Sequence, residues 1–503
     1  MKIRVITAAV IAALVQSVAG QPNGLLFKNA ELVDGTGGPA QRADVRIAGD
    51  AITEIGASLP AKAGERVIDV SGKVLAPGFI DMHSHADRGL DESPDAESQV
   101  RQGITTAVVG QDGGGELPVA DFYEHIERLH PAINYATSVG HGTVRRIVLG
   151  ADFKRPSTAA EIETMKALVD RGMRDGAVGL SSGLEYDPGF YSTTDELVAL
   201  AGVIAPYGGI YSSHVRNENE GAFASWREAI EIGRRNRIPV EISHIKLGVK
   251  PVWGRAAEGL KILEDAKRDG VQVMADWYPY TYWQSSMYVL IETRDFENRD
   301  AWAKGFDDIG GARNVLITSY RPDPSYNGLT LAQIAEKRGQ DPVTTAIAMM
   351  RAAGPGTGVI ATSMSEDDLV TFVKHPLVLI CSDGGLSGRH PRGYGTFPRV
   401  LARYVRELKA LALPEAIAKM TGRSAAQLGF SDRGVVAVGK KADVTVFDPM
   451  TIQDKGVPGN AAQTPAGIAY VVVNGEVVLD NGVMTKARPG RGIKRANAGA
   501  AHD

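Results

Sequence analysis

Cysteine is almost absent from this chain of 503 residues, which contains only Cys381. A single cysteine excludes an intramolecular disulfide and leaves no residue for lipidation near the N-terminus. The folded chain must therefore be stabilised by a large hydrophobic core or a bound metal ion rather than by covalent cross-links. Internal repeats are also lacking, and the only biased tract is the Gly- and Arg-rich tail after Pro489.

An excess of basic charge is lacking as well. Lys and Arg total 55 against 59 Asp and Glu, which gives a net charge of -4, and no long run of like charge occurs. A chain with this balance has no positive field that would attract a polyanion. The composition therefore argues against nucleic acid as a partner, and the length predicts one large domain with a smaller one.

Long apolar runs are confined to the N-terminus. Lys2 and Arg4 precede the apolar run 5–15, which is followed by small residues. This order is typical of a signal peptide, and we expect residues 1–20 to be cleaved. The run is too short to span a bilayer comfortably, so an uncleaved membrane anchor is the less favoured alternative. We therefore predict a periplasmic or secreted protein without stable membrane insertion after cleavage.

Short alternating strands punctuated by glycine occupy both ends of the mature chain. In the N-terminal part, 21–74, the predicted strands are 25–32, 43–48, 51–55 and 67–70. In the C-terminal part, 431–490, they are 434–436, 442–447, 468–474 and 475–478. We expect the two parts to pair into one small β-sandwich subdomain, followed by a flexible tail at 491–503.

Between these parts, from 75 to 430, apolar strands alternate with amphipathic helices, as expected of a parallel sheet covered by helices. The candidate strands are 78–82, 105–109, 134–139, 178–180, 210–213, 240–243, 271–275 and 377–381. Eight such strands predict an α/β fold of the (β/α)8 TIM-barrel type. The charged segment from about 287 to 358 does not fit this alternation, and we expect an insertion that covers the barrel mouth.

Two histidines end the first of these strands. His83 and His85 are two residues apart, so in an extended strand their side chains lie on the same side and can share a metal ion. Neutral imidazole is a standard zinc ligand, and barrels of this kind place their chemistry at the carboxyl ends of the strands. Taken alone, a His-x-His pair is more often incidental than functional.

The same pattern at other strand ends strengthens the metal hypothesis. Two later strands end in Ser-His, at His214 and His244, and the strand 377–381 is followed by Asp383. Chance or packing accounts for any one of these residues better than for all of them together. Four imidazoles and a carboxylate at barrel strand ends predict a binuclear zinc site.

Several further motifs are similar to those of one known family. They are Gly103-Ile104-Thr105-Thr106, Gly140-His141-Gly142-Thr143-Val144-Arg145, Gly179-Leu180-Ser181-Ser182-Gly183-Leu184-Glu185-Tyr186, Tyr278-Pro279-Tyr280, the segment from His390 to Arg399, and Gly439-Lys440-Lys441-Ala442-Asp443. With the strand-end histidines, they resemble the amidohydrolase superfamily and, within it, the N-acyl-D-amino-acid deacylase (D-aminoacylase) family, over nearly the whole mature chain. The resemblance implies a metal-dependent hydrolase with two zinc ions that cleaves the amide bond of N-acyl amino acids. The residues themselves leave D or L selectivity open.

One metal ligand of that family has no counterpart in this sequence. Its members carry a metal-binding cysteine in an Asn-Cys-Gly context after the second strand, where this chain has Gln111-Asp112-Gly113. The superfamily's usual bridging ligand, a carboxylated lysine or a glutamate, follows the fourth strand, and Glu185 occupies that place. We assign the bridge to Glu185. Asp112 is the competing choice for the bridge, but we favour a structural role for it, because an aspartate in a Gly-rich turn is commonly structural.

The resemblance also implies ligand sets and catalytic roles. One ion is expected on His83, His85, Glu185 and Asp383, and the other on Glu185, His214 and His244. Zinc lowers the pKa of bound water to about 7, and we expect Asp383 to carry the proton from this water to the leaving amine.

Further residues are candidates for contact with the substrate. His141 or Tyr186 is expected to help to stabilise the oxyanion, although a structural role for His141 at its Gly-rich strand end is an equal alternative. By the resemblance, the substrate carboxylate is held by Lys246, Tyr278, Ser285 and Arg392. Arg392 is the first choice, since a guanidinium binds a carboxylate with two hydrogen bonds.

Two other functions stay open at this point. The first is another amidohydrolase on the same scaffold, such as a dipeptidase or a hydrolase of cyclic amides or carbamates. The second is a metal-binding barrel protein without catalysis. Retention of Asp383 argues against the second, because metal binding alone needs no proton carrier.

Overall fold

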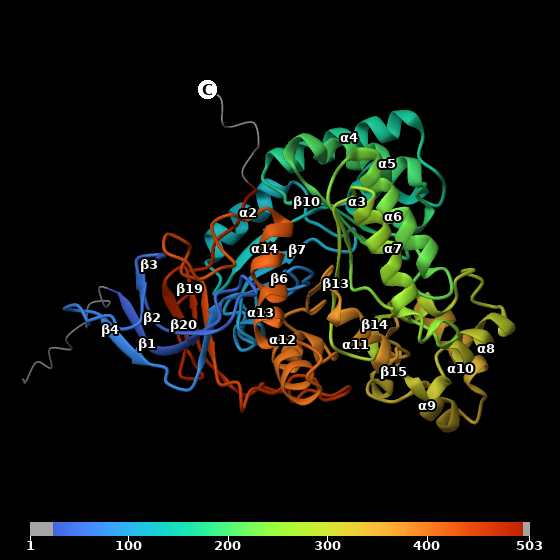
Figure 1. Cartoon of the computed structure of the whole chain (residues 1–503). Helices are drawn as coiled ribbons and strands as arrows, with labels where there is room; N and C mark the ends of the chain where they lie inside the picture. Colours follow the sequence, from blue (N-terminus) through green and yellow to red (C-terminus); the bar gives the residue numbers. More distant parts are fainter. Residues whose placement is uncertain (1–23, 496–503) are drawn as a thin grey trace, which may run out of the picture.

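The computed structural model describes residues 24–495, which form a barrel with a β subdomain at its side (Figure 1). The predicted leader, 1–20, lies outside the described residues, and so do residues 496–503. Within 24–495, no helix combines the length and the apolar character that are needed to cross a membrane.

The β subdomain is a nine-stranded sheet built from both ends of the described chain. Its strands are β1 (Leu25–Leu32), β2 (Gln41–Ala48), β3 (Ala51–Gly56), β4 (Arg66–Asp69), β5 (Val74–Pro77), β18 (Val444–Phe447), β19 (Ile468–Val473), β20 (Glu476–Asp480) and β21 (Val483–Met484). The order is β21-β20-β19-β18-β5-β1-β2-β3, with β4 paired to β1. The antiparallel pair β5–β18 joins the two ends of the chain, as predicted.

Alternating apolar residues of these strands form the core of the subdomain. Phe27, Val45, Leu75 and Val446 are all buried in it. The strand predicted at 434–436 is wrong: this segment lacks regular structure, and its described backbone bonds include only one to the N-terminal part, from Val436 N to Asp34 O. Gly434 has a φ of 85°, which is incompatible with a strand.

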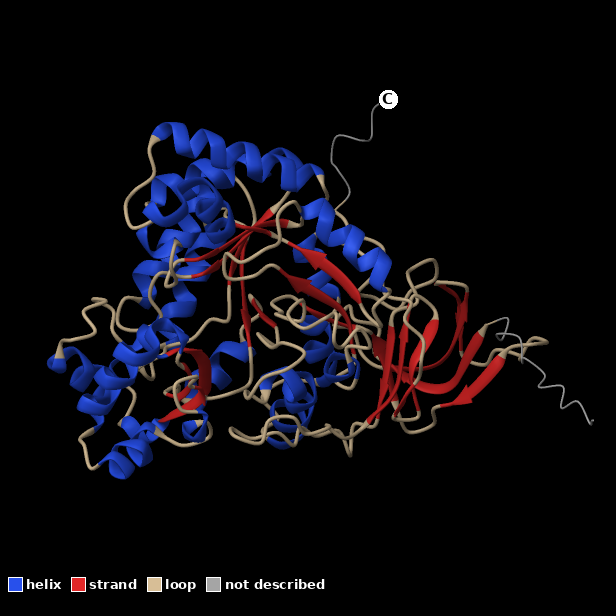
Figure 2. Cartoon of the chain, turned by 180° about the vertical axis from the view of Figure 1, so that it is seen from behind, coloured by secondary structure: helices blue, strands red, loops and turns tan. Residues whose placement is uncertain are grey.

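Eight parallel strands form the barrel beside this sheet (Figure 2). They are β6 (Phe79–Asp81), β7 (Ile104–Val109), β8 (Asn134–Thr137) with its continuation β9 (Val139–Gly140), β10 (Gly179–Gly183), β11 (Ile210–His214), β12 (Val240–Ile242), β13 (Val273–Trp277) and β17 (Val378–Ile380). The ring closes between the last strand and the first, where Asp383 N donates to His83 O at 2.8 Å and His85 N donates to Gly384 O at 2.8 Å. This pattern agrees with the predicted barrel of eight strands.

Helices cover the outside of the barrel (Figure 2). They are α1 (Glu97–Val100), α2 (Val119–Leu129), α3 (His141–Leu149), α4 (Ala159–Arg174), α5 (Thr194–Ile204), α6 (Ala222–Asn236), α7 (Ala256–Arg268), α11 (Glu366–Lys374), α12 (Arg392–Arg399), α13 (Leu413–Met420) and α14 (Gly422–Leu428). In α4, for example, Met165, Val169 and Met173 are spaced four residues apart and form its buried stripe. Thr158 and Glu161 close a capping box at its start.

The segment 282–362 lies between β13 and β17 in the sequence and forms a small unit of its own, hereafter the insertion. It contains the antiparallel sheet of β14 (Tyr282–Ser286), β15 (Val315–Ser319) and β16 (Gly358–Thr362), and the helices α8 (Arg299–Asp308), α9 (Leu331–Arg338) and α10 (Pro342–Ala353). It begins a few residues before the predicted start at 287, because β14 is needed to pair with β16.

The described part of the predicted flexible tail is bound to the barrel. Ile493 N donates to Tyr135 O at 2.7 Å, and Arg495 N donates to Gly176 O at 3.0 Å. Tyr135 N in turn donates to Arg491 O at 3.0 Å. The prediction of flexibility is therefore wrong for 491–495, since these residues continue the hydrogen bonding of β8.

Candidate metal centre

A cavity of about 830 Å³ opens at the carboxyl ends of the barrel strands. Its inner wall is formed by strand-end residues, among them His85, Asp112, His214, His244 and Asp383. The insertion supplies part of the opposite wall through Ser285, Val289, Leu290 and Thr318. The cavity therefore lies between the barrel and the insertion, and all the histidines that line it come from outside the insertion.

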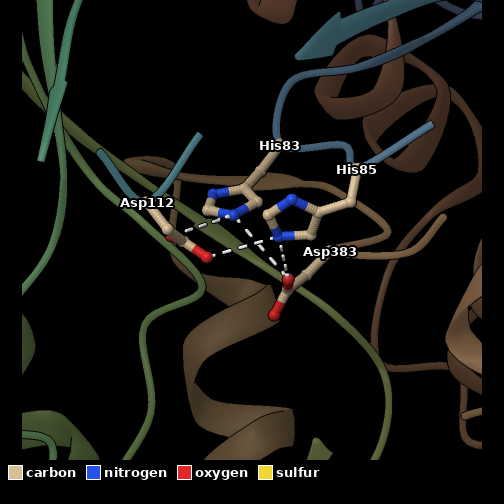
Figure 3. Close-up of side chains that lie close together, drawn as sticks. All are labelled: His83, His85, Asp112 and Asp383. Carbon is tan, nitrogen blue, oxygen red and sulfur yellow. Dashed lines mark ion pairs between the residues drawn. The ribbon is translucent and has the colours of Figure 1, made fainter. Parts of the chain in front are cut away.

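One cluster of potential ligands combines two histidines with two aspartates (Figure 3). His83 Nε2 lies 3.3 Å from Asp112 Oδ1 and 3.7 Å from Asp383 Oδ1. His85 Nε2 lies 3.3 Å from Asp112 Oδ2 and 3.3 Å from Asp383 Oδ1. The prediction that His83, His85 and Asp383 converge at one point is consistent with these distances.

The second cluster shares Asp112 with the first. His214 Nδ1 and His244 Nε2 face each other at 2.9 Å. Asp112 Oδ1 lies 4.0 Å from this nitrogen of His214 and 3.5 Å from that of His244. The carboxylate of Asp112 therefore stands between the two pairs of histidines.

The predicted bridging role of Glu185 does not agree with this geometry. Potential ligands form a group where their ligand atoms all lie within 4.8 Å of one another. In the described residues, Glu185 falls in one such group, with His214 and Glu218, and in no group with His83 or His85. Its Oε2 lies 3.0 Å from His214 Nε2, which is the ring nitrogen on the side away from Asp112. Asp112, the competing choice from the sequence, lies in both groups of potential ligands and therefore between the two histidine pairs.

The backbone explains how Asp112 reaches this position. Asp112 has a φ of 55° between Gly110 and Gly113, whose φ values are 72° and 75°. A Cβ at Gly110 would meet Ser138 O at 2.7 Å, so only glycine fits this turn. His244 and Asp383 also have left-handed backbones, with φ of 36° and 50°. Strained residues of this kind cluster at functional sites, where the surrounding structure holds them.

The donor set fits divalent zinc. Both ring nitrogens of His83 and the Oδ1 atom of Asp112 are buried without a hydrogen-bond partner. Buried polar atoms without partners are costly, and coordination to a metal ion satisfies their lone pairs. Imidazole nitrogen and carboxylate oxygen are both ordinary zinc ligands.

The electrostatics of the cluster favour positive charge. Burial by itself lowers the pKa of His83, but Asp112, Asp383 and Asp276 outweigh it and raise that pKa. Burial by itself raises the pKa of Asp112, but His83, His244 and His85 hold it well below its usual range. The carboxylates that raise the pKa of His83 would attract a divalent cation by the same negative charge.

Two glutamates contact the ring nitrogens that face away from Asp112. Glu185 lies beside His214 Nε2, and Glu218 Oε1 lies 3.1 Å from His244 Nδ1. Lys246 Nζ donates to Glu218 Oε1 at 2.5 Å and lies 2.8 Å from His244 Nδ1. Carboxylates in such positions fix the tautomer and orientation of a ligand histidine. The sequence did not single out Glu218, since it is one of several polar residues in the loop after β11.

Asp383 is held from the cavity side by a buried arginine. Arg392 Nη1 lies 2.6 Å from Asp383 Oδ2, and its guanidinium lies 5.0 Å from the centre of the Tyr278 ring. Burial by itself raises the pKa of Asp383, but Arg392 and the histidines outweigh it and hold that pKa well below its usual range. Arg392, predicted to bind the substrate, is thus paired with the predicted proton carrier.

The other predicted substrate-binding residues line the same cavity. They are Tyr186, Lys246, Tyr278 and Ser285. The hydroxyl of Tyr278 is buried without a hydrogen-bond partner. The ring of Tyr186 lies 4.3 Å from that of His214, centre to centre. A free hydroxyl beside the clusters is available to a bound ligand.

His141 is not among the residues that line the cavity, so the predicted catalytic role does not agree with the structure. It begins α3, is fully buried, and places Nε2 2.8 Å from Glu196 Oε1. The same carboxylate binds Arg145, which also donates to Pro188 O at 3.1 Å. This geometry favours the structural alternative for His141, which belongs to a buried ionic network with Glu196 and Arg145.

The sequence profile described as "Amidohydrolase family" matches residues 66–304 and 324–479. The chain therefore belongs to the amidohydrolase family, as the sequence motifs indicated. It is similar to the N-acyl-D-glutamate deacylase of Alcaligenes xylosoxydans xylosoxydans, with 36% identity over 495 residues, which cover 94% of this chain and 96% of that protein. It is also similar to the D-aminoacylase of the same organism, with 34% identity over 95% of this chain and 99% of that protein.

A solved structure gives the same result. The N-acyl-D-glutamate deacylase of Bordetella bronchiseptica, complexed with zinc and a phosphonate inhibitor, matches this chain with a TM-score of 0.85 and 35% identity. The match covers 94% of this chain and 99% of that one. The predicted family and the predicted barrel fold are therefore confirmed.

Proposed function

We propose that this protein is a zinc-dependent amidohydrolase that cleaves the amide bond of N-acyl-D-amino acids. The observation that carries the proposal is the position of Asp112 in the cavity wall, where its carboxylate lies between two pairs of histidines. Its oxygens lie 3.3 Å from His83 and from His85, and Oδ1 also lies 3.5 Å from His244. Asp383, a carboxylate suited to proton transfer, lies beside the first pair. Relatives that cover nearly the whole chain are named as deacylases of N-acyl-D-amino acids.

The proposed metal ligands form two sets. His83, His85, Asp112 and Asp383 would hold one zinc ion, and Asp112, His214 and His244 would hold the other. Bound zinc polarises the substrate carbonyl and makes water nucleophilic near neutral pH. Glu185 and Glu218 orient the rings of His214 and His244 from the far side.

Asp383 carries the proton in the proposed reaction. Its carboxylate stays ionised beside Arg392, so Oδ1 accepts a proton from the attacking water. The same atom then donates this proton to the amine nitrogen as the carbon–nitrogen bond breaks. The products are a free amino acid and a carboxylic acid, which then loses the second proton of the water to the amine or to solvent, and Asp383 returns to its starting state.

Five residues of the cavity wall would position the substrate. Burial raises the pKa values of Tyr186 and Tyr278 well above the usual range, so both hydroxyls stay protonated and can donate. Tyr186, beside His214, is placed to donate to the developing oxyanion. Tyr278, Lys246 and Ser285 would bind the carboxylate of the amino acid, with Arg392 contributing the part of its guanidinium that does not bind Asp383.

The test is a substrate panel on the metal-loaded protein. N-acetyl derivatives of D- and L-glutamate, leucine and methionine would be compared with dipeptides, hydantoins and dihydropyrimidines by following the release of free amine or acid. We expect turnover of the N-acetyl-D-amino acids and its loss after chelation, with recovery on adding zinc. Turnover confined to a cyclic amide or a dipeptide, or activity that persists after removal of metal, would contradict the proposal.

Ser285→Ala tests the substrate-binding wall. We expect KM for an N-acetyl-D-amino acid to rise about tenfold with little change in kcat, since one hydrogen bond to a charged group contributes about 1.5 kcal/mol. The matched control is Ser286→Ala, because the Ser286 hydroxyl already donates to Pro355 O at 2.9 Å. Equal KM values for the two variants would show that Ser285 does not bind the substrate carboxylate.

We also propose that the protein is exported and acts in the periplasm or outside the cell. The support is the sequence of the leader, in which two basic residues precede an apolar run and small residues. Cell fractionation and N-terminal sequencing of the mature protein test this proposal. A cytoplasmic protein that retains residues 1–20 would refute it.

A further inference from the structure

The buried carboxylate of Asp276 lies beside one histidine of each proposed metal site. Asp276 lies on β13, is 1% exposed, and is not among the residues that line the cavity. Its Oδ1 accepts hydrogen bonds from His244 N at 2.6 Å and from the Cys381 thiol at 2.9 Å. Its Oδ2 lies 4.0 Å from His83 Nδ1. One buried carboxylate thus faces a histidine of each pair.

On one side, Asp276 supports the backbone that carries His244. The φ of His244 is 36°, a left-handed conformation that residues with a side chain adopt only when their surroundings impose it. Asp276 binds this turn twice, because its side chain accepts from His244 N and its main-chain oxygen accepts from Ile245 N at 2.7 Å. The turn directs Nε2 of His244 towards Asp112.

On the other side, Asp276 faces the ring of His83. The Nδ1 atom of His83 is buried without a hydrogen-bond partner, whereas Nε2 points towards Asp112 and Asp383. When Nε2 of a neutral histidine coordinates a metal, Nδ1 carries the proton. A carboxylate facing that N–H stabilises this tautomer and strengthens the ligand.

We infer that Asp276 is a positioning residue that serves both metal sites, through the backbone of His244 and through the ring of His83. Asp276 touches neither substrate nor the proposed metal ions, and it acts through the two histidines. The inference rests on the ligands proposed above, but not on the identity of the acyl substrate.

Two substitutions separate the two contacts. In Asp276→Asn, the amide oxygen at the Oδ1 position still accepts from His244 N, but the negative charge opposite His83 is lost. In Asp276→Ala, both contacts are lost. The matched control is Glu241→Gln on the neighbouring strand β12, because Glu241 is equally buried and its described hydrogen bond comes from Gln427.

The measurement is the zinc affinity of each site, by titration in chelator-buffered zinc. Absorption spectra of the cobalt-substituted protein distinguish the two sites. We expect Asp276→Asn to weaken the ion at His83 and His85 by about 10- to 100-fold and to leave the other ion near the wild-type affinity. Asp276→Ala should weaken both ions, and Glu241→Gln neither. If Asp276→Ala does not fold, the zinc affinities of the two sites in Asp276→Asn test the inference without it.

Three outcomes would overturn the inference. They are wild-type zinc affinity in Asp276→Asn, equal weakening of both ions in that variant, and a loss of affinity in Glu241→Gln as large as in Asp276→Asn. A merely structural role would lower the melting temperature of the metal-free protein without changing zinc affinity. If the wild-type protein binds two zinc ions tightly but hydrolyses no N-acyl amino acid, the proposed function fails and the inference about Asp276 stands.

Discussion

Changing Asp383 to asparagine is expected to lower kcat by about a thousandfold, which is within the range that general acid–base groups contribute. An amide does not accept the proton from water, so both the attack on the carbonyl and the departure of the amine lose their proton carrier. KM should change much less, because the cavity wall that holds the substrate is intact. Steady-state rates with an N-acetyl-D-amino acid measure this effect.

Asp383 is also proposed to hold one zinc ion, so a lower kcat could come from a lost ion rather than from the lost proton carrier. Measuring the zinc content of the variant separates these two causes. In Asp383→Asn, the ion on His214 and His244 should remain, and the ion on His83 and His85 should be restored by excess zinc. A kcat within about tenfold of the wild-type value at full zinc loading would show that Asp383 is not the proton carrier.

Changing Asp112 to alanine is expected to remove tightly bound zinc and activity together. Asp112 is the only described residue that both groups of histidines share in the structure. Even partners that merely orient a ligand contribute about 10- to 100-fold to metal affinity, so the loss of a shared ligand should exceed about 100-fold at both sites. Metal analysis after dialysis against chelator-buffered zinc tests this, alongside the loss of turnover.

Two further variants decide between the candidates for the bridge. Asp112→Cys should restore zinc binding, because a thiolate is a zinc ligand and the family places a cysteine at this point of the chain. Glu185→Gln should retain both ions with at most a moderate loss at the His214 site, since Glu185 contacts only the far nitrogen of that ring. Loss of both ions in Glu185→Gln, with zinc retained in Asp112→Ala, would reverse the assignment.

The strand-end histidines could be predicted because their positions follow from periodicity alone. A strand places alternate side chains on one face, and parallel strands of a barrel end at one rim, so His83, His85, His214 and His244 had to approach one another once the strands were recognised. The pairing of the two ends of the chain could be predicted for the same kind of reason, since alternating strands at both ends each leave an apolar face to be covered. The strand that makes this contact, β5, was not among the predicted strands.

The residues in turns and loops could not be placed in this way. Asp112 reaches the centre through a left-handed turn between glycines, and its direction depends on φ values that have no periodic signature. Glu185 follows the fourth strand as expected, but its loop turns it to the far side of His214. His141 follows a strand end as well, yet it begins a helix and points to Glu196.

Because β5 pairs with β18, which follows it by more than 360 residues in the sequence, the subdomain cannot be completed until β18 has been synthesised. Until then, β5 presents an unpaired edge of backbone donors and acceptors, which is the kind of surface that nucleates aggregation. Strand pairs so distant in sequence also form slowly, since a long loop must close before the contact is gained. We therefore expect the junction of β5 with β18 to form late in folding, and a truncation that removes β18 to leave the edge of β5 exposed.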